Sequence, residues 1–299
     1  MRVALVFDRT RQDTSGQYFE RALASLGVSV KHFWLRDAET IPQDFDWYLR
    51  IDHGDYVRDL PRHLRPSAFY MIDTHLRRPL HQMRRVASHY DVLFCAQREA
   101  LRTFLRAVWV PAACDVALHG AGEAARGAYM YDVGFVGTEG GIPRKFYLQA
   151  LRERYPNSYI GWAPHTKIGE MYRASRLVFN FAINNDINMR VFEALGAGRC
   201  LLTNAIHGNG FEELFRDREH LVVYHSPQEL WQLLDYYLTH DDERERIAQE
   251  GHVLVRAQHT YRHRAETMLN VLNQRLGLQR DAPSTRELVS PMQQEPSLR

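Results

Sequence analysis

The strongest constraint on the fold is a series of short apolar runs that alternate with helical patterns along most of the chain. Each run is nearly continuous in apolar residues, which is typical of parallel strands covered on both faces by helices. In the first half, the runs lie at residues 3–7, 28–33, 47–51, 68–72 and 92–95. The segment after the first run repeats its apolar residues at helical spacing before Gly27. This half is therefore predicted to be a doubly wound α/β domain.

A second series of the same kind begins after a segment rich in Pro, Ala and Gly at residues 110–129, which suits a connection between domains. Its strands are expected at residues 132–136, 158–162, 177–181, 200–203 and 221–224. Its helices are expected at residues 144–154, 188–198, 241–258 and 261–276, with a further helix capped by Ser226. We expect domains at 1–125 and 126–278, and a polar, mobile tail at 279–299.

Composition limits the function. At 299 residues with 45% hydrophobic positions, the chain can bury two ordinary cores. The net charge is only +2, from 38 basic and 36 acidic residues, so nucleic acid is not an expected partner. The three cysteines lack the spacing of zinc sites or disulfide scaffolds, which favours a reducing compartment: they are Cys95, Cys114 and Cys200.

The chain shows neither a signal-peptide pattern nor an apolar run of membrane-spanning length, so a cytoplasmic location is expected. Peripheral contact with a membrane stays open, and the oligomeric state is not determined. The fifteen histidines are scattered without partners at ligand spacing, so no metal site is expected.

The segment NMRVFEALGAGRCLLTN, residues 188–204, combines an amphipathic helix with a glycine-rich end. Arg190 and Glu193 are three positions apart and share one face of that helix, whereas its apolar residues share another. Gly198 can end the helix in a left-handed conformation before the next strand. The polar pair faces either a cleft or the solvent, and the pattern leaves both interpretations open.

This segment and its neighbours together resemble the C-terminal half of GT-B glycosyltransferases. The resemblance covers about residues 132–269 and includes GFEELF, LVVYHSPQELWQLLDYYLTHDDERERIAQEG and HTYRHRAETML in order. The pattern is similar to the spore-maturation CgeB-like, glycosyltransferase family 1/4-like group. It implies two Rossmann-like domains that face each other across a cleft, the first binding the acceptor and the second a UDP-, GDP- or dTDP-sugar. The resemblance also implies that no metal ion is needed for the reaction.

The resemblance also implies a role for Glu193, which matches the family glutamate that binds the donor ribose. A carboxylate can accept hydrogen bonds from both vicinal hydroxyl groups. Many family members carry another glutamate eight positions earlier, where this chain has Asn185. Because an amide carries no charge, this departure leaves the donor sugar and the stereochemical course of the reaction open.

A diphosphate site is predicted in DVGFVGTEGGIPRKFYLQAL, where a strand, a glycine loop and a helix follow one another. Backbone amides, the positive end of a helix and two cations suit a diphosphate, although a plain loop with solvated charges has the same pattern. By resemblance, we assign donor contacts to this loop and to polar side chains after later strands. The predicted residues are Gly137, Thr138, Arg144, Lys145, Arg190, Asn188, Asn185 and, at the base, His165.

In the first half, polar residues follow strands and so are expected to line the cleft. Gly16 lies near the start of the first helix, where it either binds the phosphate of the nucleotide sugar or simply permits a turn. If the enzyme inverts configuration, a general base must come from this side. The candidates are Asp73 and His75, followed by Asp13, although turn or capping roles would explain each of them equally well.

The sequence therefore predicts a metal-independent glycosyltransferase that acts on an acceptor hydroxyl of a glycan, a lipid-linked sugar or a protein. Two alternatives stay open. One is a GT-B-shaped nucleotide-sugar epimerase, and the other is a non-catalytic protein that kept the fold and binds sugar nucleotides or polysaccharides. Asn185 is the feature that favours the second alternative.

Overall fold

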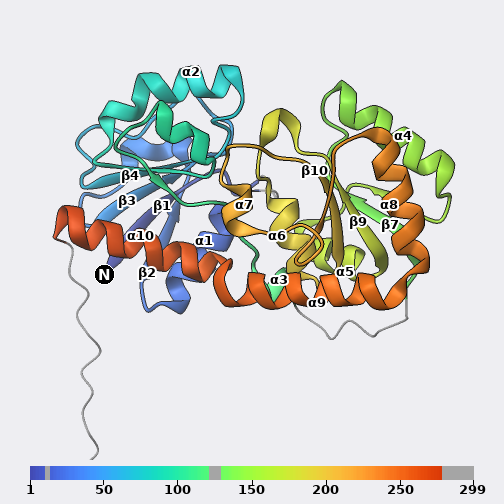
Figure 1. Ribbon diagram of the computed structural model, residues 1–299. Coiled ribbons are helices and arrows are strands. Elements are labelled where there is room, and N and C mark those ends of the chain that lie inside the picture. Colours follow the sequence, from blue (N-terminus) through green and yellow to red (C-terminus); the bar gives the residue numbers. More distant parts are fainter. Residues whose placement is uncertain (11–13, 121–128, 278–299) are drawn as a thin grey trace, which may run out of the picture.

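The computed structural model describes residues 1–10, 14–120 and 129–277. Two parallel sheets lie side by side, each covered by helices (Figure 1). The first sheet has the order β2-β1-β3-β4-β5-β6. Its strands are β1 (Arg2–Val6), β2 (Ser29–Phe33), β3 (Trp47–Ile51), β4 (Ser67–Met71), β5 (Val92–Cys95) and β6 (Val108–Trp109).

The second sheet has the order β11-β10-β9-β7-β8, and all of its pairings are also parallel. Its strands are β7 (Tyr131–Val136), β8 (Tyr159–Gly161), β9 (Ser175–Asn180), β10 (Cys200–Asn204) and β11 (Val222–Tyr224). In each sheet, the first strand along the chain lies between its successor on one side and later strands on the other. The order in which the chain adds strands to the sheet therefore reverses next to β1 and next to β7. In such sheets a crevice opens at this point, beyond the carboxyl ends of the strands.

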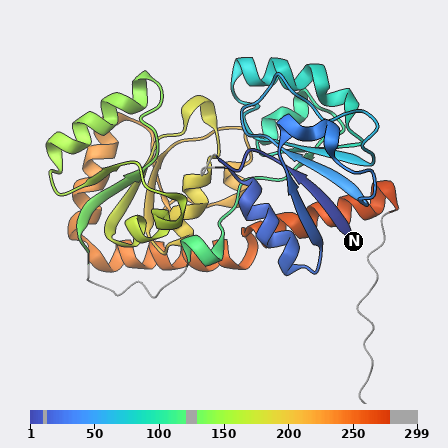
Figure 2. The same ribbon diagram turned by 180° about the vertical axis from the view of Figure 1, so that it is seen from behind.

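Helices cover both faces of the two sheets. In the first half these are α1 (Gly16–Ser25) and α2 (Arg77–Val86). The second half contains α3 (Val116–His119), α4 (Ile142–Arg154), α5 (Ile168–Arg173), α6 (Met189–Gly196), α7 (Phe211–Leu214), α8 (Pro227–Thr239) and α9 (Asp241–Gln258). The last helix, α10 (Tyr261–Leu276), follows α9 along the lower edge of both halves, as the two opposite views show (Figures 1 and 2).

The α/β prediction with two doubly wound halves is confirmed, and most predicted elements are present within two residues of their expected bounds. Ser226 caps α8, because its hydroxyl accepts a hydrogen bond from the amide of Glu229 at 3.1 Å. The three cysteines are free and buried, as expected for small apolar residues. Within the described residues, no helix has both the length and the apolar character needed to span a membrane.

The last helix differs from the expected division of the chain. We predicted that residues 126–278 form one domain, but α10 buries Tyr261, Ala265, Met268 and Leu269 in the core of the first sheet. Its apolar face complements α1, against which it packs. By packing, α10 is therefore part of the first half. The expected boundary at residue 125 and the tail at 279–299 lie outside the described residues.

The chain crosses between the halves twice, and the two crossings pair with each other. The amide of Cys114 donates to the carbonyl of His259, and the amide of Tyr261 donates to the carbonyl of Cys114, both at 3.0 Å. Next to them, the buried guanidinium of Arg264 donates to the carbonyls of Pro111 and Ala112 at 2.9 and 3.2 Å. Burial lowers the pKa of Arg264 to about 10. The crossing therefore depends on a buried cation that is held by backbone carbonyl groups.

Replacing Arg264 with Met is expected to destabilise the fold by about 3 kcal/mol, because several buried carbonyl groups would lose their donors. Urea unfolding measures this loss. The matched control is Arg262→Met, since Arg262 is exposed on the same helix and contacts Ser25. That change is expected to cost less than about 1 kcal/mol. Equal losses in the two variants would contradict a special role for the buried guanidinium.

Candidate functional site

The candidate site lies at the carboxyl ends of β7 and β9, where the strand order of the second sheet reverses. Arg190 on α6 spans these two strands. Its guanidinium donates to the carbonyl of Val136 at 2.9 and 3.1 Å and to Oδ1 of Asn180 at 2.8 Å. It also lies over the ring of Phe135, 4.2 Å from the ring centroid. These contacts hold a cation in place at the crevice where ligands bind in such sheets.

A second guanidinium lies close by. Arg144, in the first turn of α4, is buried and donates to the carbonyl of Glu139 at 3.0 Å. Burial, and to a smaller extent the positive charge of Arg190, lower the pKa of Arg144 to about 10. Within the described part of the chain, neither arginine forms an ion pair with a carboxylate. Two adjacent cations in this state favour an anionic ligand.

Two glycines make room for these arginines. A Cβ atom on Gly137 would lie 2.5 Å from Nη2 of Arg190, and one on Gly140 would lie 2.1 Å from Nη2 of Arg144. Both glycines also have positive φ angles, of 141° and 67°. The glycine loop is therefore required for the placement of the cations as well as for its own turn.

The polar residues before α6 form a connected group. Asn188, at the N-cap of α6, donates to Oδ1 of Asn180 at 3.2 Å and to Oδ1 of Asp186 at 3.4 Å. Burial raises the pKa of Asp186, whereas the charges of His75, Arg190 and Arg144 oppose this shift. The first half also contacts this segment, because the amide of Ile187 donates to Oε1 of Gln97 at 3.0 Å.

Glu193 lies deeper along α6 and is buried. Burial raises the pKa of its carboxyl group to about 7, although Arg190 opposes the shift. No donor among the described residues lies within hydrogen-bond distance of its carboxylate. Its nearest partner is Nε2 of His119, 3.7 Å from Oε1. The acceptor capacity of Glu193 is therefore available to a ligand.

His119 presents a neutral ring to Glu193. Burial lowers the pKa of His119 to about 3, with a further contribution from Arg21. Nδ1 accepts a hydrogen bond from the amide of Asp115 at 3.0 Å, so the ring proton is on Nε2, the atom nearest to Glu193. A ligand hydroxyl could therefore meet a carboxylate acceptor and an imidazole donor together.

His165 lies on the same side of the site, at the start of the short 3₁₀ helix that follows β8. Its pKa is lowered by burial and by the charge of Arg21. Arg21 in turn forms an ion pair with Asp115 at 2.6 Å, which joins α1 to the N-cap of α3. Three predicted donor residues, Arg190, Glu193 and His165, are therefore close to contacts between the halves.

The side chain of Asn185 does not point toward Arg190 and Glu193. Its Oδ1 accepts from the amide of His207 at 2.8 Å, and its Nδ2 donates to the carbonyl of the same residue. Its φ angle of 64° places it in the left-handed region. The side chain thus joins two loops, and its role in donor binding stays a prediction.

The remaining predicted donor residues are less enclosed. Thr138 and Lys145 are exposed, so the structure brings Arg144, but not Lys145, to the buried pair of cations. Gly16 begins α1 directly over the ring of Phe7, and a Cβ atom there would lie 2.3 Å from that ring. This close packing explains Gly16 without a ligand, although its predicted contact with phosphate stays untested.

The predicted bases in the first half have different surroundings. His75 is partly buried, its Nδ1 has no hydrogen-bond partner among the described residues, and its charge acts on Asp186. Asp73 lies instead near the hydroxyl of Tyr56, at 3.5 Å. Asp13 lies outside the described residues.

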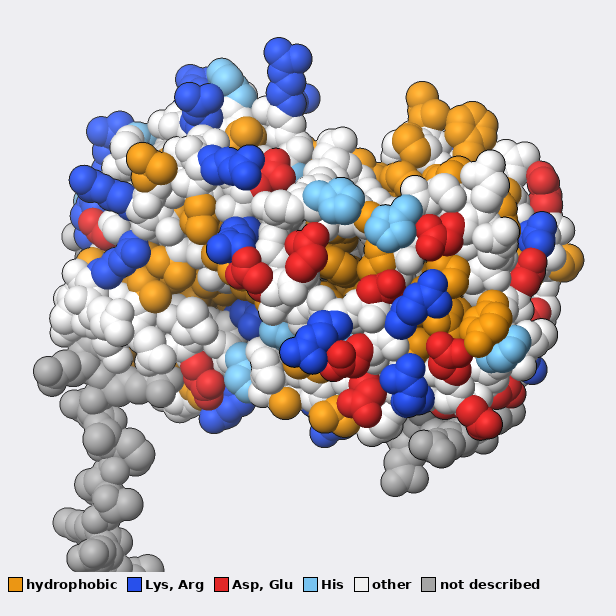
Figure 3. Space-filling view, in the orientation of Figure 1, with side chains coloured by type: hydrophobic (Ala, Val, Ile, Leu, Met, Phe, Trp, Pro, Cys, Tyr) orange, Lys and Arg blue, Asp and Glu red, His pale blue; other side chains and the backbone are white. Residues whose placement is uncertain are grey.

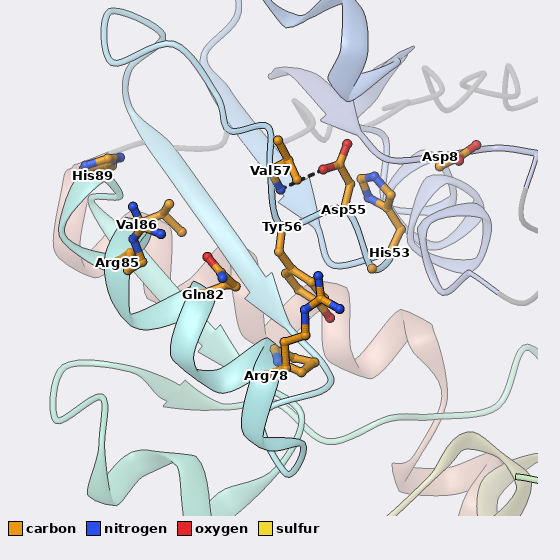
Figure 4. A pocket seen from close by; sticks show the side chains of 12 residues that line it. Asp8, His53, Asp55, Tyr56, Val57, Arg78, Gln82, Arg85, Val86 and His89 are labelled. Atoms are coloured by element: carbon orange, nitrogen blue, oxygen red, sulfur yellow. Dashed lines mark hydrogen bonds between the residues drawn. The ribbon is translucent and has the colours of Figure 1, made fainter.

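The first half also contains a pocket of about 920 Å³ between the loop after β3 and α2 (Figure 4). Asp8 follows β1 and His53 follows β3, so the pocket opens from the corresponding crevice of the first sheet. Arg78 and Gln82 of α2 lie across from Tyr56 in the close-up view. The walls of the pocket therefore carry both basic and acidic groups.

Asp186, Asn180 and His119 were not predicted. Asp186 lies within INNDIN and is the only acidic residue of that segment, which is a signal that the sequence did contain. Asn180 ends an apolar strand, and His119 lies in a segment without periodicity, so neither could be assigned from its neighbours. Within the described residues, no group of three or more His, Cys, Asp or Glu side chains could hold a metal ion.

Comparison with known families and structures supports this description. A family model described as glycosyl transferase-like matches residues 97–270, which is more than half of the chain. Among curated proteins, no sequence matches the chain significantly.

Several solved structures share the fold at low sequence identity. HepE from Anabaena, solved with UDP and glucose, is 11% identical, with a TM-score of 0.62 over 92% of this chain and 100% of that chain. A sucrose-phosphate synthase from Thermosynechococcus elongatus is 11% identical, with a TM-score of 0.64 over 93% and 99%. An α-glucosyltransferase in complex with UDP is 8% identical, with a TM-score of 0.69 over 91% and 100%. The predicted GT-B fold is thereby confirmed.

The raised pKa of Glu193 predicts a stability that depends on pH. Because the pKa is raised on folding, the stability that the protonated carboxyl group contributes is complete below its ordinary value near 4.5 and is lost as the pH rises through about 7. Glu193→Gln is therefore expected to stabilise the fold at about pH 8, by up to about 3 kcal/mol, and to have little effect near pH 4.

Urea unfolding at the two pH values measures this difference. The control is Glu153→Gln, since Glu153 is exposed on α4 and its substitution is expected to change stability by less than about 0.5 kcal/mol at either pH. A destabilised Glu193→Gln protein at high pH would show that the carboxylate has a charge partner in the folded state.

Proposed function

The chain belongs to the glycosyl transferase-like family, and on this premise we propose that it transfers a sugar from a nucleoside diphosphate donor, held by the second half, to an acceptor hydroxyl group bound by the first. The observation that carries the proposal is the pair of guanidinium groups at the end of β7. Arg144 and Arg190 are close enough for their charges to interact, and both are held by carbonyl or amide oxygens.

The two arginines would stabilise the diphosphate as it leaves. Negative charge develops on the bridging oxygen when the sugar–phosphate bond breaks, and fixed donors in a partly buried site stabilise that charge without reorganising. The contacts with Val136, Asn180 and Glu139 hold the guanidinium groups before the donor arrives. This role needs no general acid at the leaving group.

Glu193 would bind the ribose. Its carboxylate can accept hydrogen bonds from the two vicinal hydroxyl groups, and Nε2 of His119 can donate to one of the hydroxyl oxygens. HepE and the α-glucosyltransferase were both solved with UDP, which makes a UDP-sugar the first donor to test. Because hydroxyl groups bind better to the ionised carboxylate, UDP should bind more tightly as the pH rises through about 7.

His75 is the residue of the first half that we place next to the reacting atoms. Its charge acts on Asp186 beside Arg190 and Arg144, whereas Asp73 lies near the hydroxyl of Tyr56. If the reaction inverts configuration, the neutral form of His75 can accept the acceptor proton at Nδ1. If it retains configuration, the departing phosphate oxygen can take that proton, and His75 then orients the donor sugar.

The pocket between α2 and the loop after β3 is the site proposed for the acceptor. It opens from the crevice of the first sheet, near the ends of β1 and β3. Metal-independent transfer and a cytoplasmic location remain predictions. A protein that binds sugar nucleotides without turnover, or an epimerase, would bind the same donor but would not consume an acceptor.

Arg190→Ala is expected to lower kcat by about 100-fold, because the leaving diphosphate would lose a fixed cation. Release of UDP from UDP-glucose or UDP-N-acetylglucosamine in the presence of candidate acceptors measures turnover. The control is Arg152→Ala, since Arg152 is an exposed arginine on α4 that pairs with Glu139. Binding of UDP without turnover of any donor would favour the non-catalytic alternative, and failure of all nucleoside diphosphates to bind would refute the proposal.

A pair of neighbouring glycines offers a sharper test of the diphosphate site. Gly140→Ala would place a methyl group against the guanidinium of Arg144, whereas a Cβ atom on Gly141 meets nothing within 4 Å. We expect Gly140→Ala to weaken UDP binding by about tenfold and Gly141→Ala to leave it unchanged. Calorimetric titration with UDP measures both. Equal affinities in the two variants would show that Arg144 does not contact the diphosphate.

A further inference from the structure

The exposed face of α2 is an uninterrupted row of cationic side chains. Arg77, Arg78, Arg84 and Arg85 are exposed, with His81 between them, and the helix contains no acidic residue. Lys and Arg side chains gather over this helix in the space-filling view (Figure 3). Within the described residues, none of the four arginines has a hydrogen-bond or ion-pair partner. This absence contrasts with other exposed arginines, such as Arg152 and Arg154, which pair with carboxylates.

The row adjoins the pocket proposed for the acceptor. Arg78 and Arg85 line that pocket, whereas Arg77 and Arg84 lie outside it on the same helix. Arg77 and Arg84 are seven residues apart, which corresponds to about 10 Å along a helix axis. A ligand that reached all four would therefore have to be an extended chain rather than a single small anion.

We propose that α2 binds an acidic glycan chain and so guides one of its units into the pocket as the acceptor. This inference rests on the proposed function. The pocket volume of about 920 Å³ suits one small unit of the chain, and the carboxylate or phosphate groups of neighbouring units would pair with the arginine row. The two carboxylates of the pocket already have partners: Asp8 accepts from Thr10, and Asp55 accepts from the amides of Val57 and Arg58.

The surface of α2 favours a glycan over two other anionic partners. Helices that bind membranes insert large apolar side chains, but Leu80, Met83 and Val86 of α2 pack against the core of the first half instead. Proteins that bind single-stranded nucleic acids offer aromatic side chains to the bases. The exposed aromatic residues among those described, Phe146, Trp162 and Tyr236, lie in the second half.

The test compares two double variants with the same change in charge. Arg77→Gln with Arg84→Gln removes two cations of the row, and Arg102→Gln with Arg256→Gln removes two exposed cations elsewhere. The probe is a fluorescently labelled decasaccharide of galacturonic acid, and a neutral glucan of equal length is its control. We expect the α2 variant to bind the acidic probe about tenfold more weakly, with a smaller dependence on salt, and the other variant to bind like the wild type.

Several results would overturn the proposal. They are equal binding of the neutral glucan, equal losses in both double variants, or binding of single-stranded DNA or phosphatidylglycerol vesicles by a protein that does not bind the acidic glycan. Titration of the wild type with UDP separates this inference from the proposed function. If UDP binds and the acidic probe does not, only the inference about α2 fails. If UDP does not bind, the proposed function fails as well.

Discussion

The paired crossings at Cys114 and Thr260, with Arg264 beside them, are the contact on which the arrangement of the two halves depends. Two chain segments that are far apart in sequence exchange backbone hydrogen bonds there, as neighbouring strands do. Other contacts between the halves are polar, such as the hydrogen bond from the amide of Ile187 to Gln97 and the ion pair of Arg21 with Asp115, or apolar, because Leu118 and Met189 pack against the core of the first half. Polar contacts of this kind are easily exchanged for water. The crossing therefore joins the two halves through the backbone itself, whereas the contacts of Gln97 and Arg21 depend on individual side chains.

The site itself holds charges that cost stability in the unliganded protein. Arg144 lies near a second cation, the pKa of Asp186 is raised, and Glu193 is buried with no hydrogen-bond donor among the described residues. Rigid neighbours keep these groups in place: Phe135 lies beneath both guanidinium groups, and glycines leave them room. A diphosphate and a ribose would supply the missing partners. Electrostatic strain of this kind is common where a ligand must be bound strongly during the reaction.

Local patterns predicted much of the fold. The strands β3 and β5 and the helices α9 and α10 have the predicted bounds, because apolar runs, caps and glycine stops depend only on nearby residues. Packing between distant segments was not predictable in this way. The periodicity of α10 shows that it has an apolar face. It does not show which sheet that face covers, because this depends on packing against α1. At the contact between Ser25 and Arg262, α1 and α10 are more than 230 positions apart in sequence.

In the candidate site too, local patterns predicted some residues and not others. Arg190 and Glu193 were predicted from helical spacing and a family resemblance, and Arg144 from a glycine loop that follows a strand; Arg190 lies at the strand ends, with Arg144 near it. Asn185 was predicted from a position in the same motif, but its left-handed backbone turns its amide toward His207. Asp186, one residue later, accepts from Asn188 and lies near the charges of Arg190 and Arg144. The backbone conformation of a turn determines where each of its side chains points, and no periodic pattern predicts it.

The net charge of the whole chain does not describe the charge on one of its surfaces. The balance of 38 basic and 36 acidic residues argues against a polyanionic partner only if the charges are evenly spread. In this chain, α2 has four arginines and no acid, whereas α9 begins with Asp241, Asp242 and Glu243 at the positive end of its dipole. Acids placed at such a helix end stabilise that helix, and α9 begins in the second half, whereas α2 covers the first sheet (Figure 1). An anion near α2 therefore experiences the local row of cations, and the near-neutral total does not weaken that attraction.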